Sequence, residues 1–588
     1  MRKDIQCDVL VIGGGAAAGK AAIAAHDGGA SVAVVMKGAF GTSGASAYKI
    51  AEILGYNVAD GQADPEDSPE VHYADVMRAA AGMADPELAK VLTDESIETL
   101  RDLERLNIPF HKNEDGSYFE VLGCFATKPR MHLIPGHAEP IVHAQKEEIY
   151  KRGIPVYEWT MLTKFLVENN QVCGAVGLNR QGETVVFQAK AIIMGTGGAG
   201  QLFSYNINPS DITGDGYSLG FKAGAELINM EFMQAGPGLI YPCKNMFNSW
   251  LWAFHPEVTN GRGEHFIRNY LPEGMTVERC MDLRSGHYPF SSYDGSQWID
   301  VSIQTEIKEG RGGPHGGVIV DFTKIDLDKL PHNARGEEIR KSWNITVNWL
   351  IENRDLDLRT TPVEVAILGH AINGGLLIDE HGGTTIKGLY AAGETSGGPH
   401  GADRLGGNMV LTCQVYGKRA GLAAAEFIKQ VEALPVPAEQ VTGETERLQM
   451  LLDKQGTVKP HHLKKQLQEI MWKYVLVTRS EESLTTAIEK LQALRRTFET
   501  DIVVNNRKEL THAIEAENLL LIGEIISRVA RMRKETRGSH FRVDYQKRDD
   551  EQHLYRIATR LEGEEIKHRK IASDPETVRR FPYDIVHA

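Results

Sequence analysis

Cysteine is scarce in this 588-residue sequence, which contains only six. They are Cys7, Cys124, Cys173, Cys243, Cys280 and Cys413, and no two of them form a Cys-x-x-Cys pair. Iron–sulfur clusters and zinc fingers are usually held by closely spaced cysteines, so we expect neither in this chain, and no other spacing predicts a metal site. If the protein exchanges electrons through clusters, those clusters must belong to another subunit.

Long apolar runs are also lacking. No stretch of about 18 apolar residues occurs, so no transmembrane helix is expected. The first residues, Met1 to Asp4, lead directly into an apolar segment and leave no room for a signal peptide, so we expect a cytoplasmic protein that reaches a membrane only through partner subunits. The 65 Lys and Arg residues are outnumbered by 79 Asp and Glu residues, a balance that disfavours a nucleic-acid-binding surface.

What the sequence does contain is a glycine-rich turn close to its start. Residues 7–12 are mostly apolar and predict a strand, residues 16–25 are rich in alanine and predict a helix, and Gly13-x-Gly15-x-x-Ala18 lies between them. Gly13 permits a tight turn, Gly15 permits close approach of a pyrophosphate, and Ala18 permits close packing of helix on strand. The helix N-terminus supplies N–H donors, so the segment predicts a dinucleotide site.

The next segments indicate which dinucleotide is bound. A second strand, residues 30–37, ends in Met36-Lys37, where a simple NAD site usually has an acidic residue for the ribose. Residues 161–187 alternate as a three-stranded meander and lead into a strand that ends in a second glycine turn, 195–200. A meander before such a turn is typical of FAD-binding domains with a Rossmann core.

Several other segments predict local structure around this core. Residues 68–81 and 85–106 read as helices, and residues 123–132 read as a loop. Asp215, in Thr213-Gly214-Asp215-Gly216, is expected to accept N–H bonds in the first turn of a helix. A strand ending in Gly393-Glu394 precedes a glycine-rich stretch and a helix over 410–429, whose N-terminus is expected to point at the cofactor.

Taken together, these motifs resemble one protein family. The segments 195–200, 213–216, 388–394, 400–408 and 533–550 occur in the order found in flavoprotein subunits of succinate dehydrogenases and fumarate reductases. L-Aspartate oxidase and the adenylylsulfate reductase alpha subunit belong to the same family. The resemblance covers nearly the whole chain and implies an FAD-dependent oxidoreductase.

The resemblance also implies a fold. It is an α/β protein with a Rossmann-like FAD-binding domain, an inserted α+β capping domain, a helical bundle and a small C-terminal region. The implied boundaries are 1–235 and 364–434 for the two parts of the FAD domain, 236–363 for the capping domain, 435–533 for the bundle and 534–588 for the C-terminal region.

Site residues follow from the same resemblance. Arg404 and His370 match substrate-binding residues of the family, and Arg262 and Glu264 match an Arg-Gly-Glu segment of its capping domain. The expected cofactor-binding residues are Gly13, Gly15, Ala18, Lys37, Ser43, Gly44, Ala45, Thr196, Gly197, Gly198, Asp215, Glu394, Arg404, Gly407 and Asn408.

Three positions depart from the family pattern. The His-Pro-Thr-Gly segment of fumarate reductases and succinate dehydrogenases is replaced by residues 234–238 without a histidine, and no arginine stands near Ser296 where the family's proton-passing arginine is expected. His255, His265, His287 and Tyr288 are candidates for a replacement acid. The loop at Ser43 also lacks the histidine of covalent flavoproteins, so noncovalent FAD is expected.

These features lead to one preferred function and two alternatives. We expect a flavoprotein subunit that reduces or dehydrogenates a small anionic substrate, with electrons passing through a separate, ferredoxin-like iron–sulfur partner. An adenylylsulfate-reductase-like alpha subunit would instead have an adenosine pocket lined by aromatic and basic groups of the capping domain, whose aromatic residues include Trp250 and Trp252. A flavin electron-transfer subunit without substrate chemistry is the third interpretation.

Overall fold

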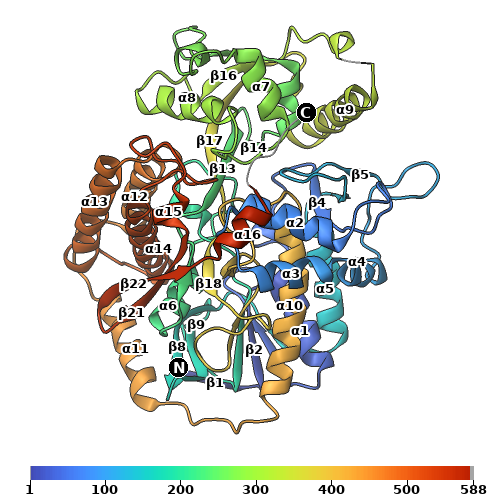
Figure 1. Ribbon diagram of the computed structural model, residues 1–588. Helices are drawn as coiled ribbons and strands as arrows, with labels where there is room; N and C mark the ends of the chain where they lie inside the picture. The colour runs from blue at the N-terminus through green and yellow to red at the C-terminus, as the bar shows by residue number, and fades with distance from the viewer. Residues whose placement is uncertain (1, 331, 583–588) are drawn as a thin grey trace.

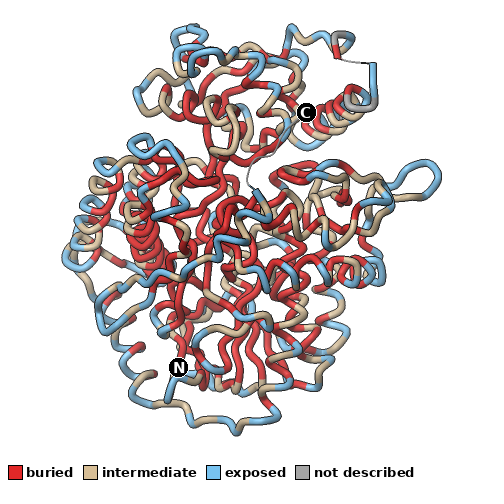
Figure 2. The backbone as a smooth tube through the Cα atoms, in the orientation of Figure 1, coloured by how far each residue is buried: buried red, intermediate tan, exposed pale blue. Residues whose placement is uncertain are grey.

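A computed structural model describes residues 2–330 and 332–582, and a five-stranded parallel sheet lies at its centre (Figure 1). The strand order is β19 (Leu389–Ala391), β11 (Ala191–Met194), β2 (Val9–Ile12), β3 (Val32–Val35) and β7 (Val156–Tyr157). Helices α1 (Ala16–Asp27), α5 (Glu139–Lys151) and α10 (Asn408–Phe427) pack beside it. Both β2 and β11 are fully buried, as expected for strands covered on two faces (Figure 2).

Small residues bring α1 and α10 unusually close together. A Cβ atom at Gly421 would lie 2.5 Å from the carbonyl oxygen of Ala21, and one at Gly417 would lie 2.8 Å from that of Ala17. Real Cβ atoms do not approach backbone this closely, so only glycine fits at these two positions of α10. The contact holds α1 and α10 against each other beside the sheet.

The predicted meander is present, with one strand more than expected. Its sheet has the order β1 (Arg2–Gln6), β10 (Thr184–Gln188), β9 (Gln171–Leu178) and β8 (Met161–Glu168). The N-terminal residues therefore do not lead directly into the central sheet, because β1 pairs in parallel with β10 first.

Two expectations for residues 64–135 are corrected. The helix expected over 85–106 is two helices, α3 (Pro86–Asp94) and α4 (Ser96–Arg105), which follow α2 (Pro69–Ala80). The hydroxyls of Thr93 and Ser96 bond to carbonyls of the preceding turn at the break, competing with the regular helical pattern. The loop expected at 123–132 ends in β6 (Met131–Pro135), the middle strand of a small sheet with β4 (Ile53–Asn57) and β5 (Glu120–Val121).

A separate layer lies beyond one end of the central sheet, at the top of Figure 1. The long antiparallel strands β13 (Met233–Tyr241) and β17 (Val363–Ile372) enter and leave it. It also contains β14 (Asn245–Met246), β15 (Glu257–Thr259), β16 (Val318–Asp321), α7 (Val277–Ser285), α8 (Gln297–Lys308) and α9 (Ala334–Arg354). The implied start of the capping domain, residue 236, falls within β13. Its implied end, residue 363, is the first residue of β17.

Helices dominate the C-terminal part of the chain. They are α11 (Ala438–Leu452), α12 (Pro460–Tyr474), α13 (Glu481–Thr500) and α14 (Arg507–Met532), and the expected stripe Leu484, Ile488, Leu491 and Leu494 is buried on α13. Two further strands, β21 (Tyr555–Glu562) and β22 (Glu565–Ala572), extend a sheet containing β12 (Leu227–Ile228), β18 (Gly375–Leu377) and β20 (Ser396–Gly397). Within the described ranges, no helix has the length and apolar character needed to cross a bilayer.

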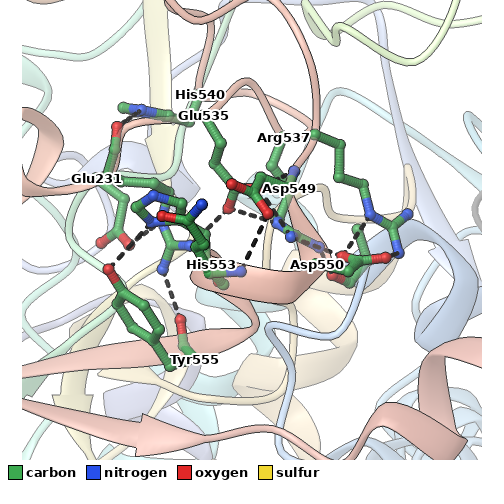
Figure 3. Close-up of polar contacts among 12 residues, drawn as sticks. Glu231, Glu535, Arg537, His540, Asp549, Asp550, His553 and Tyr555 are labelled. Carbon is green, nitrogen blue, oxygen red and sulfur yellow. Dashed lines mark hydrogen bonds and ion pairs between the residues drawn. The ribbon is translucent and has the colours of Figure 1, made fainter.

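A buried network of ion pairs joins the C-terminal segment to the start of β13 (Figure 3). Arg533 donates through Nε to Glu231 and through Nη1 to Glu535, each at 2.8 Å. Arg537 also donates to Glu535 at 2.8 Å and reaches Asp550 at the surface. Arg533, Glu231 and Glu535 are completely buried.

Replacing Arg533 with methionine is expected to destabilise the whole chain. The variant leaves Glu231 buried without its cation, and loss of one partner of a buried pair costs about 3–5 kcal/mol. Thermal unfolding followed by circular dichroism should show a clearly lower Tm. The matched control is Arg531→Met, near the end of α14 and two residues before Arg533. The Arg531 side chain is 40% exposed and lies as far as 3.8 Å from its acidic partner. Equal Tm values for the two variants would contradict this interpretation.

Candidate active site

A deep cavity lies at the carboxyl ends of the central parallel strands, where open α/β sheets bind their ligands. The turns after β2, β3 and β11 form its floor, and residues from β17 and from the capping layer form its opposite wall. The sequence-predicted residues that line it are Gly13, Gly15, Lys37, Ser43, Gly44, Ala45, Thr196, Gly197, Asp215, Glu394, Arg404, Gly407 and His370.

The first glycine turn is shaped by close backbone packing. Gly13 has a φ of +114°, and a Cβ atom there would lie 2.3 Å from the carbonyl oxygen of Gly195. A Cβ atom at Gly195 would in turn lie 2.6 Å from the backbone nitrogen of Ala18. Ala18 therefore packs behind the turn rather than lining the cavity. The N-terminus of α1 faces the cavity and its N-cap residue, Gly15, has no side chain to bond there. Apart from a long contact of 3.4 Å from the Ala16 N–H to Ser46 Oγ, its first N–H groups are available to a ligand.

Lys37 is held by acidic partners instead of facing the cavity as a free cation. Its Nζ lies 2.6 Å from Thr213 Oγ1, 2.7 Å from Asp215 Oδ2 and 2.9 Å from Glu515 Oε1. Burial alone would lower the pKa of Lys37, but the two carboxylates raise it above its ordinary value. Asp215 does not cap α6 (Asp215–Lys222) as expected, because its carboxylate binds Lys37 and the cap is Gly214.

Two other expected cofactor residues lie behind the cavity wall. A Cβ atom at Gly198 would lie 2.2 Å from Glu394 Oε1, so this glycine makes room for the glutamate that does line the cavity. Asn408 begins α10, and its Oδ1 accepts a hydrogen bond from Asn57 at 2.7 Å. The N-terminus of α10 nevertheless reaches the cavity through Gly407 and Met409, in agreement with the expected direction of that helix.

Arg404 is a buried cation with only neutral partners. Its Nη2 donates to Gln234 Oε1 at 2.6 Å and its Nη1 donates to the carbonyl of Leu405 at 3.0 Å. In the described part of the chain no carboxylate lies within ion-pair distance of this guanidinium, and its Nε has no partner. Burial lowers the pKa of Arg404 to about 10, so it stays charged at neutral pH. A desolvated cation of this kind is suited to binding an anion.

Neutral polar groups surround this cation. Burial and the nearby Arg404 lower the pKa of His370 to about 3, and burial lowers that of His137 to about 4, so both imidazoles are neutral at pH 7. The ring of Tyr288 lies edge-on to that of His370, with 5.5 Å between centroids. The Tyr288 hydroxyl and one ring nitrogen of each histidine are buried without hydrogen-bond partners. Such unpaired polar atoms around a cavity fit a polar ligand.

Burial also shifts the pKa of Glu394, a carboxyl group that lines the same cavity. Glu394 accepts a hydrogen bond from the backbone N–H of Ile372 at 3.0 Å. Its pKa is raised to about 7, because burial outweighs this hydrogen bond and the charge of Arg404.

Of the four candidate replacement acids, only Tyr288 lines the cavity. His255 and His265 are exposed. His287 is buried behind Tyr288, where its Nδ1 donates to the carbonyl of Pro289 at 2.8 Å and its Nε2 accepts from Ser296 at 3.0 Å. Ser296 and His287 therefore bond to each other at the position where the family arginine is missing.

Arg262 and Glu264 are not brought to the cavity. Both are exposed in a turn of the capping layer, where Asn260 Nδ2 donates to Glu264 at 2.8 Å. Sequence reasoning did not single out several residues that do line the cavity, namely Cys124, His137 and Asn208. These three lie in irregular segments far apart in the chain, and only the folded structure brings them together.

Comparisons with known proteins agree with this geometry. Residues 8–410 match the family described as FAD binding domain, and residues 464–582 match the one described as fumarate reductase flavoprotein C-term. The chain is 34% identical to one subunit of the fumarate reductase (CoM/CoB) of Methanothermobacter marburgensis, over 92% of this chain and 94% of that protein.

Two solved structures are also similar to this chain over nearly its whole length. Mycobacterium smegmatis Sdh1, in complex with UQ1, superposes with a TM-score of 0.83 at 28% identity, covering 97% of this chain and 95% of the other. Adenylylsulfate reductase from Archaeoglobus fulgidus shares the fold, with a TM-score of 0.74 at 23% identity, covering 97% of this chain and 96% of the other.

The glycine turns, the open helix N-termini and the unpaired polar atoms around the cavity fit an FAD molecule. Fold, family match and relatives together cover nearly the whole chain. The chain therefore belongs to the fumarate reductase and succinate dehydrogenase family of flavoproteins, and it is an FAD-dependent oxidoreductase.

Proposed function

We propose that this flavoprotein subunit reduces or dehydrogenates a small anionic substrate, a carboxylate. The observation that carries the proposal is Arg404, a buried guanidinium on the cavity wall that has no carboxylate partner in the described ranges. A carboxylate substrate would supply the missing negative charge and accept charge-assisted hydrogen bonds. When bound, FAD supplies hydride transfer at its N5 atom.

The residues around Arg404 have separate roles in this proposal. Gln234 holds the guanidinium in place, since it accepts from the side chain and also donates to the Arg404 carbonyl at 3.1 Å. His370, neutral at pH 7, offers a hydrogen bond to the substrate without adding a second charge. In the reducing direction, the Tyr288 hydroxyl would give a proton to the substrate carbon in place of the missing arginine and would then be reprotonated from solvent. Burial raises its pKa, so it is protonated at neutral pH.

An iron–sulfur partner is part of the same proposal. The relative from Methanothermobacter marburgensis is named as one subunit of its reductase, and the sequence here contains no Cys-x-x-Cys pair. Electrons would therefore leave or reach this chain through a separate protein. Location in the cytoplasm stays a prediction.

FAD is proposed to bind without a covalent link, because Ser43, Gly44 and Ala45 occupy the loop where covalent members carry histidine. Acid precipitation should then leave all FAD absorbance in the supernatant.

Gly13→Ala should abolish flavin binding, because its Cβ would meet the Gly195 carbonyl. Gly443→Ala is the matched control, since nothing lies within 4 Å of a Cβ there. Yellow protein in the acid pellet, or normal flavin content in Gly13→Ala, would contradict the proposal.

The substrate class can be tested by anaerobic bleaching and recovery of the flavin absorbance. The panel contains succinate, fumarate, other saturated and unsaturated acids, L-aspartate, and sulfite with AMP. A response to one carboxylate is expected. Arg404→Gln should then abolish it, and Tyr288→Phe should slow it by about 10²–10⁴-fold, the usual contribution of a general acid. Both variants should retain FAD, and a variant with the wild-type rate would refute that residue's role.

Two other outcomes would replace the proposal. A response only to sulfite with AMP would indicate an adenylylsulfate-reductase-like alpha subunit, an alternative favoured by Trp250 on the cavity wall. No response in the presence of an electron partner, with a flavin still reducible by dithionite, would indicate an electron-transfer subunit without substrate chemistry.

A further inference from the structure

Three potential metal ligands meet on the small sheet formed by β4, β5 and β6. His132 lies on β6, Glu120 begins β5, and Asp60 follows the end of β4. One ligand atom from each, the imidazole Nε2 and two carboxylate oxygens, lies within 4.8 Å of the other two. Met131, the neighbour of His132 on β6, lines the cofactor cavity. Successive side chains of a strand point to opposite faces, so the three ligands lie on the face turned away from that cavity.

The proton on His132 is placed by its backbone contact. Its Nδ1 lies 3.2 Å from the carbonyl oxygen of Arg130, and because a carbonyl can only accept, Nδ1 carries the hydrogen. In the neutral imidazole, Nε2 then presents a lone pair to the two carboxylates. This arrangement, with Nδ1–H bonded to a carbonyl, is the one that orients metal-binding histidines.

No protein donor satisfies the atoms that face one another. His132 Nε2 lies 3.3 Å from Glu120 Oε1 and 3.5 Å from Asp60 Oδ2. Neither Nε2 nor Glu120 Oε1 has a hydrogen-bond partner. The side chains of His132 and Glu120 are 0% and 1% exposed, so water does not satisfy them from the surface. Two carboxylates and an imidazole nitrogen that point at one another need a positive charge, which either a proton on Nε2 or a metal cation between them supplies.

The neighbouring arginine does not supply a positive charge to this cluster, since Arg130 is already paired with Asp67 and Asp75.

We propose that Asp60, Glu120 and His132 bind a divalent transition-metal ion of the zinc class. Imidazole nitrogen together with carboxylate oxygen is a ligand set of such ions rather than of calcium or magnesium. Two ligands about 2.1 Å from one metal lie about 3.0–3.4 Å apart. The separations of His132 Nε2 from Glu120 and Asp60, 3.3 Å and 3.5 Å, are close to this range. The Asp60 side chain is 16% exposed, which leaves an entry path and a position for water.

The site would hold the loop after β4 and the start of β5 onto β6. Because the other face of β6 contributes Met131 to the cavity wall, the metal would stabilise that wall without contacting FAD or substrate. The spacing of the ligands, at positions 60, 120 and 132, matches no metal motif, which is why the sequence predicted no site. This inference is independent of the proposed function.

The test measures zinc bound to the tag-free, flavin-loaded chain. Protein treated with EDTA and desalted is incubated with ZnCl2, desalted again and assayed by inductively coupled plasma mass spectrometry and by Tm. Wild type is expected to retain one zinc per chain and to gain thermal stability from it. Glu120→Gln and Asp60→Asn keep side-chain shape but remove a ligand charge, so each should weaken binding by more than about tenfold.

Asp115→Asn is the matched control, because this exposed acid caps its own loop through Ser117 and lies outside the cluster. It should bind zinc as wild type does. Binding of manganese or iron at the same residues in place of zinc also supports the proposal. No binding by wild type, equal binding by the ligand variants, or binding of calcium or magnesium alone overturns it. If buried Glu120→Gln loses its flavin or its circular dichroism spectrum, the partly exposed Asp60→Asn decides.

Discussion

The buried ion pair between Arg533 and Glu231 is the contact on which the upper wall of the cavity depends. Glu231 lies two residues before β13, and Gln234, the second residue of that strand, holds Arg404 by two hydrogen bonds. Arg533 belongs to the C-terminal segment, which Glu535 and Arg537 fix in turn (Figure 3). A residue far from the cavity thus determines where the anion-binding guanidinium stands, through backbone position rather than direct contact.

Positive charge in the cavity is concentrated at Arg404. Burial removes the protons from His370 and His137, while Arg404 keeps its own because even a lowered guanidinium pKa remains far above neutrality. Lys37, the other cation on the wall, is neutralised by Asp215 and Glu515. An anion entering the cavity therefore meets the positive charge of Arg404, which neutral hydrogen-bonding groups surround and which only the partly ionised Glu394 offsets at a distance.

Local patterns in the sequence predicted much of this structure. The glycine turns at 13 and 195, the meander and the buried stripe of α13 depend on neighbouring residues, and they were found where expected. The family resemblance supplied Arg404 and His370, which line the cavity, and Arg262 and Glu264, which do not. Contacts between distant segments were not predictable, because each depends on tertiary packing rather than on periodicity. β1 pairs with β10, Lys37 pairs with Glu515, and the ligand cluster joins two strands to the loop after a third.

The pairing of Lys37 with Glu515 also bears on how the protein is made. Glu515 follows Lys37 by 478 residues and comes from α14, one of the last helices to leave the ribosome. During synthesis the N-terminal part of the chain folds first, with Lys37 and Asp215 in place but the third partner still absent. The ion pairs that hold Lys37 beside the floor of the cavity are complete only after α14 has docked. Nearly the entire polypeptide must therefore be translated before the charge of this buried lysine is fully compensated.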